Sequence, residues 1–277
     1  MDARAPLVEG NVAAFLLEMG RVGGGDERRD REVVWTVGGS PLGYHNAVVH
    51  CDAGGSRAEA LIDEWMADLE AGGLPGSWHV TPSMHPADLV RRLLNRGFED
   101  GGDEPAMVCD LSVEPEPGAP VAGLAVEPVR TAADLEAYRS VLADGFGEGP
   151  PEAAWVAEVF GRLGVGGGGP WRHWVGRVGG RAVATATVLV APEDVAGVYF
   201  VATVPTERRR GIGAAVTRHA LVEARSLGCR TAVLGSSPMG AGVYRRLGFE
   251  EVFRYRLLEW SPDSRRTTSS TRPDSTS

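Results

Sequence analysis

Cysteine is scarce in this sequence. Cys51, Cys109 and Cys229 are the three cysteines among 277 residues, and they lie far apart. Their odd number and wide spacing argue against a disulfide framework and favour a reducing compartment. None has the short spacing of a zinc site, and the sequence has no His-Glu-x-x-His motif, so we expect no metal.

Long apolar runs and an excess of positive charge are also absent. No stretch of about 18 apolar residues is available to span a membrane, and the start, MDARAPLVEG, lacks the basic and apolar regions of a signal peptide. We therefore expect a cytoplasmic protein with no membrane partner. The formal net charge of −9 gives no general attraction for nucleic acid, so we expect no such partner either.

The composition suggests two domains and a tail. The stretch VEPEPGAPVAG, residues 113–123, carries three prolines and two glycines, as an extended linker does. The last 17 residues, SPDSRRTTSSTRPDSTS, contain no aliphatic or aromatic side chain and are predicted to be disordered. The chain is thus predicted to divide into domains 1–115 and 116–260 and a tail, 261–277.

The C-terminal half has the pattern of an α+β domain around one mixed sheet. Thr131 is a predicted helix N-cap, Gly179-Gly180 a hairpin turn, and Gly228 a helix end. Periodicity and these signals predict strands at 124–129, 171–178, 181–190, 196–204, 230–237 and 249–260, and helices at 131–146, 150–164, 212–227 and 240–248.

The N-terminal half has a shorter version of the same order. RRLLNRGFED (91–100) is similar to VYRRLGFEEV (243–252), and in both the sequence Gly-Phe-Glu follows a helix. Coincidence between common helix-stop patterns is the alternative, but the shared order favours two diverged copies of one fold. The predicted elements are helices at 10–21, 56–73 and 86–97 and strands at 32–37, 44–52, 77–82 and 105–113.

The stretch TVPTERRRGIGAAV, residues 203–216, places three arginines and two glycines between a strand and a helix. Free amides at a helix N-terminus, close backbone approach at glycine and nearby guanidiniums together suit a pyrophosphate. A Walker loop is absent, and the order R-x-x-G-x-G is not the dinucleotide fingerprint. GVGGGG (164–169) matches that fingerprint formally, but it follows a helix and is interpreted as a loop.

This stretch resembles the acetyl-CoA signature of the GNAT superfamily of N-acetyltransferases, through Arg208, Gly211 and Gly213. A second similarity follows at the family's usual distance in SSPMGAGVYRRLGF (236–249). The resemblance covers about residues 124–260. It implies tandem GNAT-like domains of the α+β class (α/β three-layer type), each a mixed, mostly antiparallel sheet flanked by helices.

The resemblance also implies roles for individual residues. Tyr244 would protonate the departing CoA thiolate, or alternatively would only pack beside Leu247. Ser237 stands where many relatives have an asparagine that contacts the cofactor. The residues expected to bind acetyl-CoA are Val201, Ala202, Thr203, Arg208, Arg209, Arg210, Gly211, Ile212, Gly213, Ala214, Ser237 and Tyr244.

The sequence departs from the family in lacking a carboxylate in strands 196–204 and 231–237, where many relatives place a base. Asp144 and Glu148, between the first two helices of the domain, border the expected acceptor site, although either one taken singly is better interpreted as a solvated loop residue. Trp171 and His173 are candidates to line that site or to fill the core.

The N-terminal copy lacks the R-x-x-G-x-G signature, and Leu93 stands where the tyrosine would be. We expect that copy to be degenerate and to pack on the catalytic lobe within a monomer.

The resulting hypothesis is an enzyme that transfers acetyl from acetyl-CoA to a primary amine of a small molecule or metabolite by direct attack. A peptide or protein N-terminal acetyltransferase and a non-catalytic acyl-CoA sensor are the alternatives. The missing strand carboxylate favours the sensor, and Tyr244 opposes it.

Overall fold

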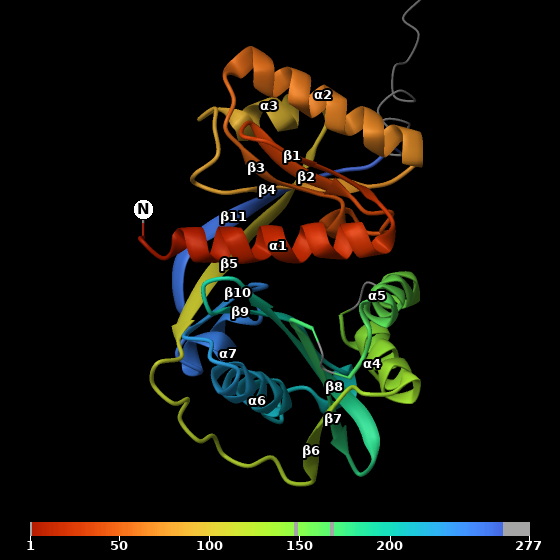
Figure 1. Ribbon diagram of the computed structural model, residues 1–277, viewed down its shortest axis with the longest axis vertical. Coiled ribbons are helices and arrows are strands. Elements are labelled where there is room, and N and C mark those ends of the chain that lie inside the picture. The colour runs from red at the N-terminus through yellow and green to blue at the C-terminus, as the bar shows by residue number, and fades with distance from the viewer. Residues whose placement is uncertain (1, 147–148, 167–168, 263–277) are drawn as a thin grey trace, which may run out of the picture. The chain divides into compact units, whose positions relative to one another are not determined.

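A computed structural model describes residues 2–146, 149–166 and 169–262 (Figure 1). The chain forms two compact units, Met1–Phe15 with Glu104–Arg254 and Leu16–Asp103 with Tyr255–Ser277. The linker-like segment 113–123 lies inside the first unit, so the division drawn near residue 115 stays a prediction about the two repeats. Of the predicted tail, residues 263–277 lie outside the described residues.

The first unit contains a mixed sheet. Its strands follow the order β5, β10, β9, β8, β7, β6. Neighbours are antiparallel except β9 and β10, which are parallel. The strands are β5 (Glu99–Asp110, from Glu104 in this unit), β6 (Leu124–Pro128), β7 (Trp171–Val178), β8 (Arg181–Ala191), β9 (Val195–Thr203) and β10 (Thr231–Gly235).

Helices cover both faces of this sheet. On β7, His173 lies against Tyr138 of α4 (Ala132–Gly145), whereas the next residue, Trp174, lies against His219 of α6 (Ile212–Ser226). Successive strand residues point to opposite faces, so α4 and α6 lie on opposite sides. α5 (Pro150–Leu163) packs on α4, and α7 (Ala241–Arg246) on α6 (Figure 1).

Local signals in the sequence account for the ends of these elements. Thr131 caps α4 in a reciprocal arrangement with Asp134: its side chain accepts from the Asp134 amide, and the Asp134 carboxylate accepts from the Thr131 amide. Gly179 and Gly180 both have positive φ, 57° and 79°, as a tight hairpin turn requires. Gly228, with φ of 94°, ends α6. These three sequence predictions are confirmed.

The second unit contains a sheet in the order β1, β2, β3, β4, β11. α2 packs on it through Trp65, whose ring meets Trp78 edge-on at 6.2 Å. The last strand of the chain, β11, supplies this sheet with an antiparallel neighbour for β4. The elements are α1 (Ala5–Gly23, from Leu16 in this unit), β1 (Asp26–Arg29), β2 (Val33–Val37), β3 (Ala47–Cys51), α2 (Gly55–Gly72), β4 (Gly76–Val80), α3 (Leu89–Asn95) and β11 (Glu250–Trp260, from Tyr255).

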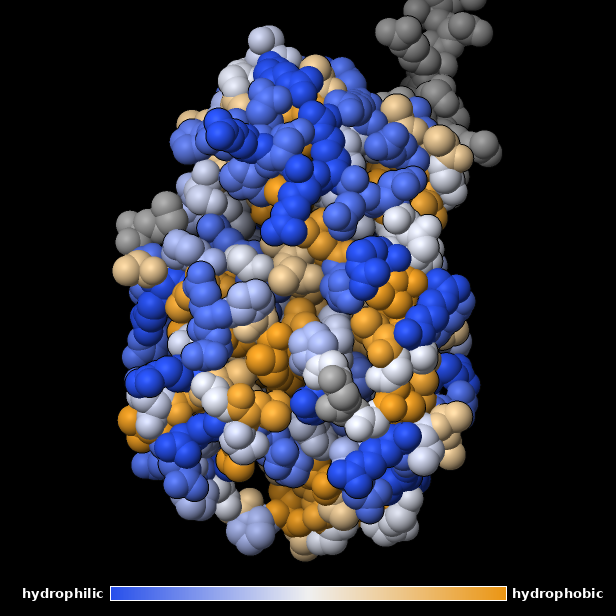
Figure 2. Space-filling view, in the orientation of Figure 1, coloured by the Kyte–Doolittle hydropathy of each residue, from blue (hydrophilic) through white to orange (hydrophobic). Residues whose placement is uncertain are grey.

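The α+β class with mixed sheets flanked by helices is therefore confirmed. β1 was not predicted, because its sequence, DERR, carries no apolar alternation. No helix among the described residues is long and apolar enough to cross a membrane. Polar residues are spread widely over the face of the molecule shown in Figure 2.

Candidate functional site

Strands β9 and β10 separate part-way along their length. Their parallel pairing covers Val195 to Gly197 of β9 and goes no further. β9 then continues to Thr203, paired with β8 alone. Within the described chain, the other edge of β9 therefore has no strand partner beyond Gly197. The predicted cofactor residues Val201, Ala202 and Thr203 lie in this stretch.

The turn after β9 has the backbone of an anion-binding concavity. Arg209 has φ of 63° and Gly211 has φ of 81°, so two left-handed residues flank Arg210. Such an alternation directs successive backbone N–H groups toward one point. The first hydrogen bond of α6 runs from Ala215 N–H to Gly211 O, so the preceding amides lie at the positive end of the helix dipole. A Cβ added to Gly213 would have Thr203 Oγ1 at 3.5 Å as its nearest neighbour, which leaves room above the turn.

The three arginines of the turn have different partners. The Arg208 guanidinium donates to the carbonyls of Thr203 (3.1 Å) and Gly145 (2.6 Å). Arg210 pairs with the buried Glu207, which also pairs with Arg181 at 2.5 Å. Among the described residues, none accepts a hydrogen bond from the Arg209 guanidinium. Of the three, Arg209 is the guanidinium available to an external anion, while Arg208 and Arg210 support the turn.

A β-bulge shapes the strand ahead of this turn. Between the pairs Thr187↔Tyr199 and Thr185↔Ala202, β9 has two residues where β8 has one. Phe200 in the bulge has φ of 50°, which is rare for a bulky residue. The Thr185 hydroxyl donates to the Phe200 carbonyl at 2.8 Å and holds the bulge from the β8 side. A bulge re-aims the residues that follow it, here the predicted cofactor edge.

Tyr244 and Ser237 lie in and just before α7, after the end of β10. The half-buried Tyr244 ring packs against Phe249, with centroids 5.8 Å apart, and a Cβ on Gly240 would lie 3.1 Å from its Cε2. Burial raises the pKa of the Tyr244 phenol to about 12. The exposed Ser237 accepts from the Gly240 amide through Oγ at 3.2 Å. Their contacts with a cofactor stay predictions.

The end of α4 lies against β9. A Cβ added to Gly145 would come within 3.0 Å of Ala202 Cβ, and the ring of Phe146 is 6.1 Å from that of Phe200. Asp144 is exposed at this end of the helix. Glu148, the other predicted acceptor residue, lies outside the described residues. Asp144 thus stays a candidate for the acceptor side of β9.

Trp171 and His173 are buried, each 5% exposed, on the α4 face of the sheet. His173 Nδ1 lies 2.9 Å from Thr187 Oγ1, which lies 2.7 Å from the Tyr138 hydroxyl. Burial lowers the pKa of His173 to about 3, so the imidazole is neutral at physiological pH. Trp171 and His173 therefore both occupy the core, which was one of the two alternatives that the sequence left open. A role for them in acceptor binding stays a prediction.

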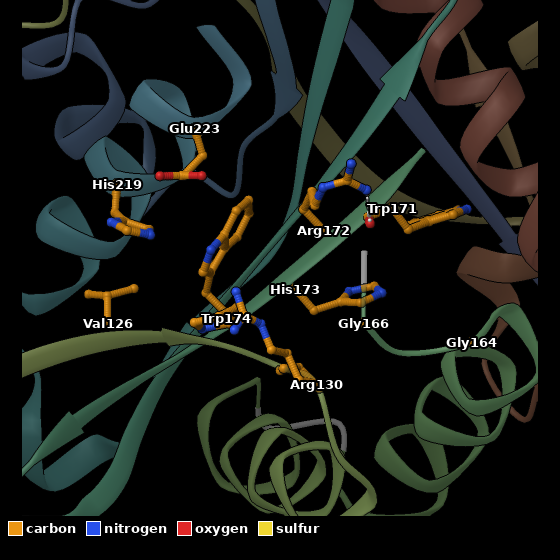
Figure 3. A pocket seen from close by; sticks show the side chains of 12 residues that line it. Val126, Arg130, Gly164, Gly166, Trp171, Arg172, His173, Trp174, His219 and Glu223 are labelled. Carbon is orange, nitrogen blue, oxygen red and sulfur yellow. Dashed lines mark hydrogen bonds between the residues drawn. The ribbon is translucent and has the colours of Figure 1, made fainter. Parts of the chain in front are cut away.

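A cavity of about 420 Å³ opens in the first unit at the β6–β7 edge (Figure 3). Trp174 and His219 form part of its wall, edge-on at 5.6 Å, with Glu223 and Arg130 beside them. Trp171 and His173 border it from the other side of β7 (Figure 3). β8 stands between this edge and β9, so the cavity is separate from the turn and the unpaired strand edge. Among the described residues, no group of three or more His, Cys, Asp or Glu side chains is placed to hold a metal ion.

Three features of this site escaped the sequence prediction. The left-handed Arg209 and Phe200 break the rule that such backbone belongs to glycine, so no residue signal marked them. The third feature is the contact of Asn11 with β9, which joins residues 188 positions apart. A single sequence gives no indication of a pair at that separation.

Residues 136–249 match the model of the acetyltransferase (GNAT) family. Among solved structures, a GCN5-related N-acetyltransferase from Kribbella flavida aligns with a TM-score of 0.65 and 20% identity over 92% of this chain and 95% of that one. A tandem GNAT protein from the clavulanic acid biosynthesis pathway aligns with a TM-score of 0.54 and 13% identity over 83% of this chain and 78% of that one. A search among curated proteins returned no significant match. The structural likenesses confirm the tandem GNAT fold.

Proposed function

Since residues 136–249 belong to the GNAT acetyltransferase family and the chain is thus an acyl-transferring enzyme, we propose that it transfers an acetyl group from acetyl-CoA to a primary amine of a small molecule. A peptide N-terminus is the alternative acceptor. Both versions use one cofactor site, formed by the β9 edge, the turn and α7.

One observation carries the proposal: the unpaired edge of β9 leads directly into the Arg209–Gly211 turn. An extended amide chain can add to such an edge as a further strand. A pyrophosphate at the end of that chain would then meet backbone N–H groups, the dipole of α6 and the Arg209 guanidinium. The pantetheine arm and pyrophosphate of acetyl-CoA have this sequence of groups.

The residues of the chain have separate parts in the proposed reaction. The amine nitrogen would attack the thioester carbonyl carbon, the carbon–sulfur bond would break, and the thiolate would take the Tyr244 phenolic proton. The attacking nitrogen would give up one proton, to Asp144 through water or directly to solvent, and the Tyr244 phenolate would regain one from solvent. Main-chain N–H groups on the β9 edge would face the carbonyl oxygen, where negative charge develops. With a pKa of about 12, Tyr244 keeps its proton at neutral pH until the thiolate appears. Packing against Gly240 and Phe249 holds its ring in place.

A sensor that binds acyl-CoA without turnover is the second candidate. The lack of any carboxylate in β9 or β10 favours it, because an ammonium acceptor must lose a proton before it attacks. In the proposed enzyme, either Asp144 acts as the base and removes this proton through a water molecule, or the amine is already neutral when it binds.

Titration calorimetry with acetyl-CoA, followed by mass spectrometry of an amine panel, tests the proposal. Gly213→Glu is the diagnostic variant, because a Cβ at this position makes only ordinary van der Waals contact and the substitution brings a carboxylate to the anion site. Val222→Glu, on the 43% exposed Val222 of the same helix, matches the charge as a control. We expect Gly213→Glu alone to abolish binding. Equal affinity in both variants would refute the proposed cofactor site, and binding without an acetylated product would favour the sensor.

A further inference from the structure

The first half of α1 belongs to the first compact unit, although its sequence precedes the acyltransferase domain by more than a hundred residues. Asn11 is 2% exposed and uses both ends of its amide on β9. Its Oδ1 accepts from the Tyr199 hydroxyl at 2.6 Å, and its Nδ2 donates to the Val195 carbonyl at 3.4 Å. The Val195 carbonyl can only accept, which fixes the orientation of the amide.

Phe15, one helical turn after Asn11, adds a second contact to the same tyrosine. Its ring stacks on Tyr199 with centroids 3.9 Å apart and planes at 9°. It also lies 5.7 Å from the ring of Phe200. Tyr199 is thus held at its hydroxyl by Asn11 and on its ring face by Phe15.

The Asn11 side chain lies so close to β9 that Gly197 has no room for a side chain of its own. A Cβ added to Gly197 would lie 1.9 Å from Asn11 Oδ1, well inside contact distance. The Asn11 amide therefore lies directly over the strand at the point where β9 parts from β10.

Tyr199 immediately precedes the bulge. The left-handed conformation of Phe200 is strained and persists only where the surroundings hold it. Thr185 holds the bulge through the Phe200 carbonyl, and Asn11 and Phe15 hold the residue before it. The direction of Ala202 and Thr203 depends on the bulge, because these residues follow it and Val201 lies within it.

We propose that Asn11 and Phe15 are positioning residues of the acyltransferase site: by fixing Tyr199, they hold the Phe200 bulge and so aim the β9 edge that binds the acyl donor. The first fifteen residues are then part of the catalytic unit, although the family similarity begins at residue 136. This inference rests on the proposed function for its ligand, but the contact itself is independent of that function.

The test uses the full chain with two variants and one control. Asn11→Leu keeps the size and removes both hydrogen bonds, and Tyr199→Phe removes the hydroxyl alone. Val175→Ala is the control, because it also removes packing atoms from the core. Val175 is 1% exposed and lies on β7, two strands away from β9. Acetyl-CoA affinity is measured by calorimetry, and amide exchange of 198–203 by mass spectrometry, at a temperature where all variants are folded.

We expect Asn11→Leu and Tyr199→Phe each to weaken acetyl-CoA binding about 5- to 50-fold and to speed exchange at 198–203, since a net hydrogen bond is worth about 1 kcal/mol and a buried orphan more. The double variant should lose no more affinity than the worse single variant, because both single variants remove the same hydrogen bond between Asn11 and Tyr199. Val175→Ala should leave affinity and local exchange unchanged. Wild-type affinity and exchange in Tyr199→Phe, or in a folded Asn11→Leu, would overturn the positioning role. If the wild-type protein itself binds no acetyl-CoA, the proposed function fails, and exchange at 198–203 still decides the inference.

Discussion

The guanidinium of Arg208 donates to the main-chain carbonyl of Gly145 at 2.6 Å and ties the end of α4 to the end of β9. Its Nε donates to the last carbonyl of that strand, on Thr203, at 3.1 Å. A cation at a helix C-terminus is favoured by the helix dipole. Arg208 therefore bridges the acceptor side and the cofactor side of the proposed site.

This bridge predicts different effects for neighbouring arginines. Arg208→Ala should lower the free energy of unfolding by about 1 kcal/mol, because two carbonyls lose a shared donor at an exposed position. Arg209→Ala should leave stability unchanged and weaken acetyl-CoA binding, since Arg209 has no protein partner among the described residues. Thermal melts and calorimetry on the two variants separate these effects. A stable Arg208→Ala protein that loses affinity as Arg209→Ala does would make Arg208 a phosphate ligand instead.

Replacing Glu207 at the same turn should lower the free energy of unfolding. Its side chain is 8% exposed and pairs with Arg181 and Arg210. Glu207→Gln keeps the shape of the side chain but leaves two arginines, each at least half exposed, without their anion. We expect a loss of about 1–2 kcal/mol in unfolding free energy, below the value for a fully buried pair because solvent screens both arginines. Denaturant melts measure it, with Glu136→Gln, from an exposed pair on α4, as the control. Equal midpoints for the two variants would contradict the prediction.

Tyr244→Phe tests the proposed acid. The variant keeps the ring and its contact with Phe249 but removes the proton. We expect kcat to fall about 10²- to 10⁴-fold with little change in acetyl-CoA affinity. Because burial raises the pKa of Tyr244 to about 12, the wild-type rate should show no alkaline loss from this group below pH 10. Unchanged kcat in an assay limited by chemistry would remove Tyr244 from the mechanism.

The elements around Tyr244 and the arginine-glycine turn were predictable from sequence because their signals are local. Thr131, Gly179-Gly180 and Gly228 act through caps and turns within a few residues. By contrast, the strand ends that form the site depend on contacts between distant segments. The hydrogen bond from Arg208 to Gly145 joins residues 63 positions apart, and the Asn11–Tyr199 contact joins two predicted domains. Local patterns carry no information about such partners.

The burial of His173 should make the free energy of unfolding depend on pH in the acid range. Burial lowers the pKa of His173 to about 3 from its ordinary value of 6.5, so below pH 6.5 the unfolded chain takes up a proton that the folded chain does not. The free energy of unfolding therefore falls as pH drops from 6.5 toward 3. His173→Gln should reduce this fall between pH 6 and pH 4 by about 2 kcal/mol. Denaturant melts across this range measure it, with His50→Gln as the control, and identical slopes in wild type and His173→Gln would contradict the assignment.

The fragment 116–277 should not behave as an independent domain. It lacks β5, the antiparallel neighbour of β10, and it lacks Asn11 and Phe15 on β9. We expect it to melt without cooperativity and to bind no acetyl-CoA. The fragment 104–262 restores β5 and should fold with reduced stability. A peptide of residues 2–20 added in trans should then raise its melting temperature, since a ligand of the folded state stabilises it by mass action. The same peptide with Asn11→Leu and Phe15→Leu is the control and should have no effect. Cooperative melting of 116–277, with acetyl-CoA affinity equal to that of the full chain, would show that the GNAT domain needs nothing from the first fifteen residues.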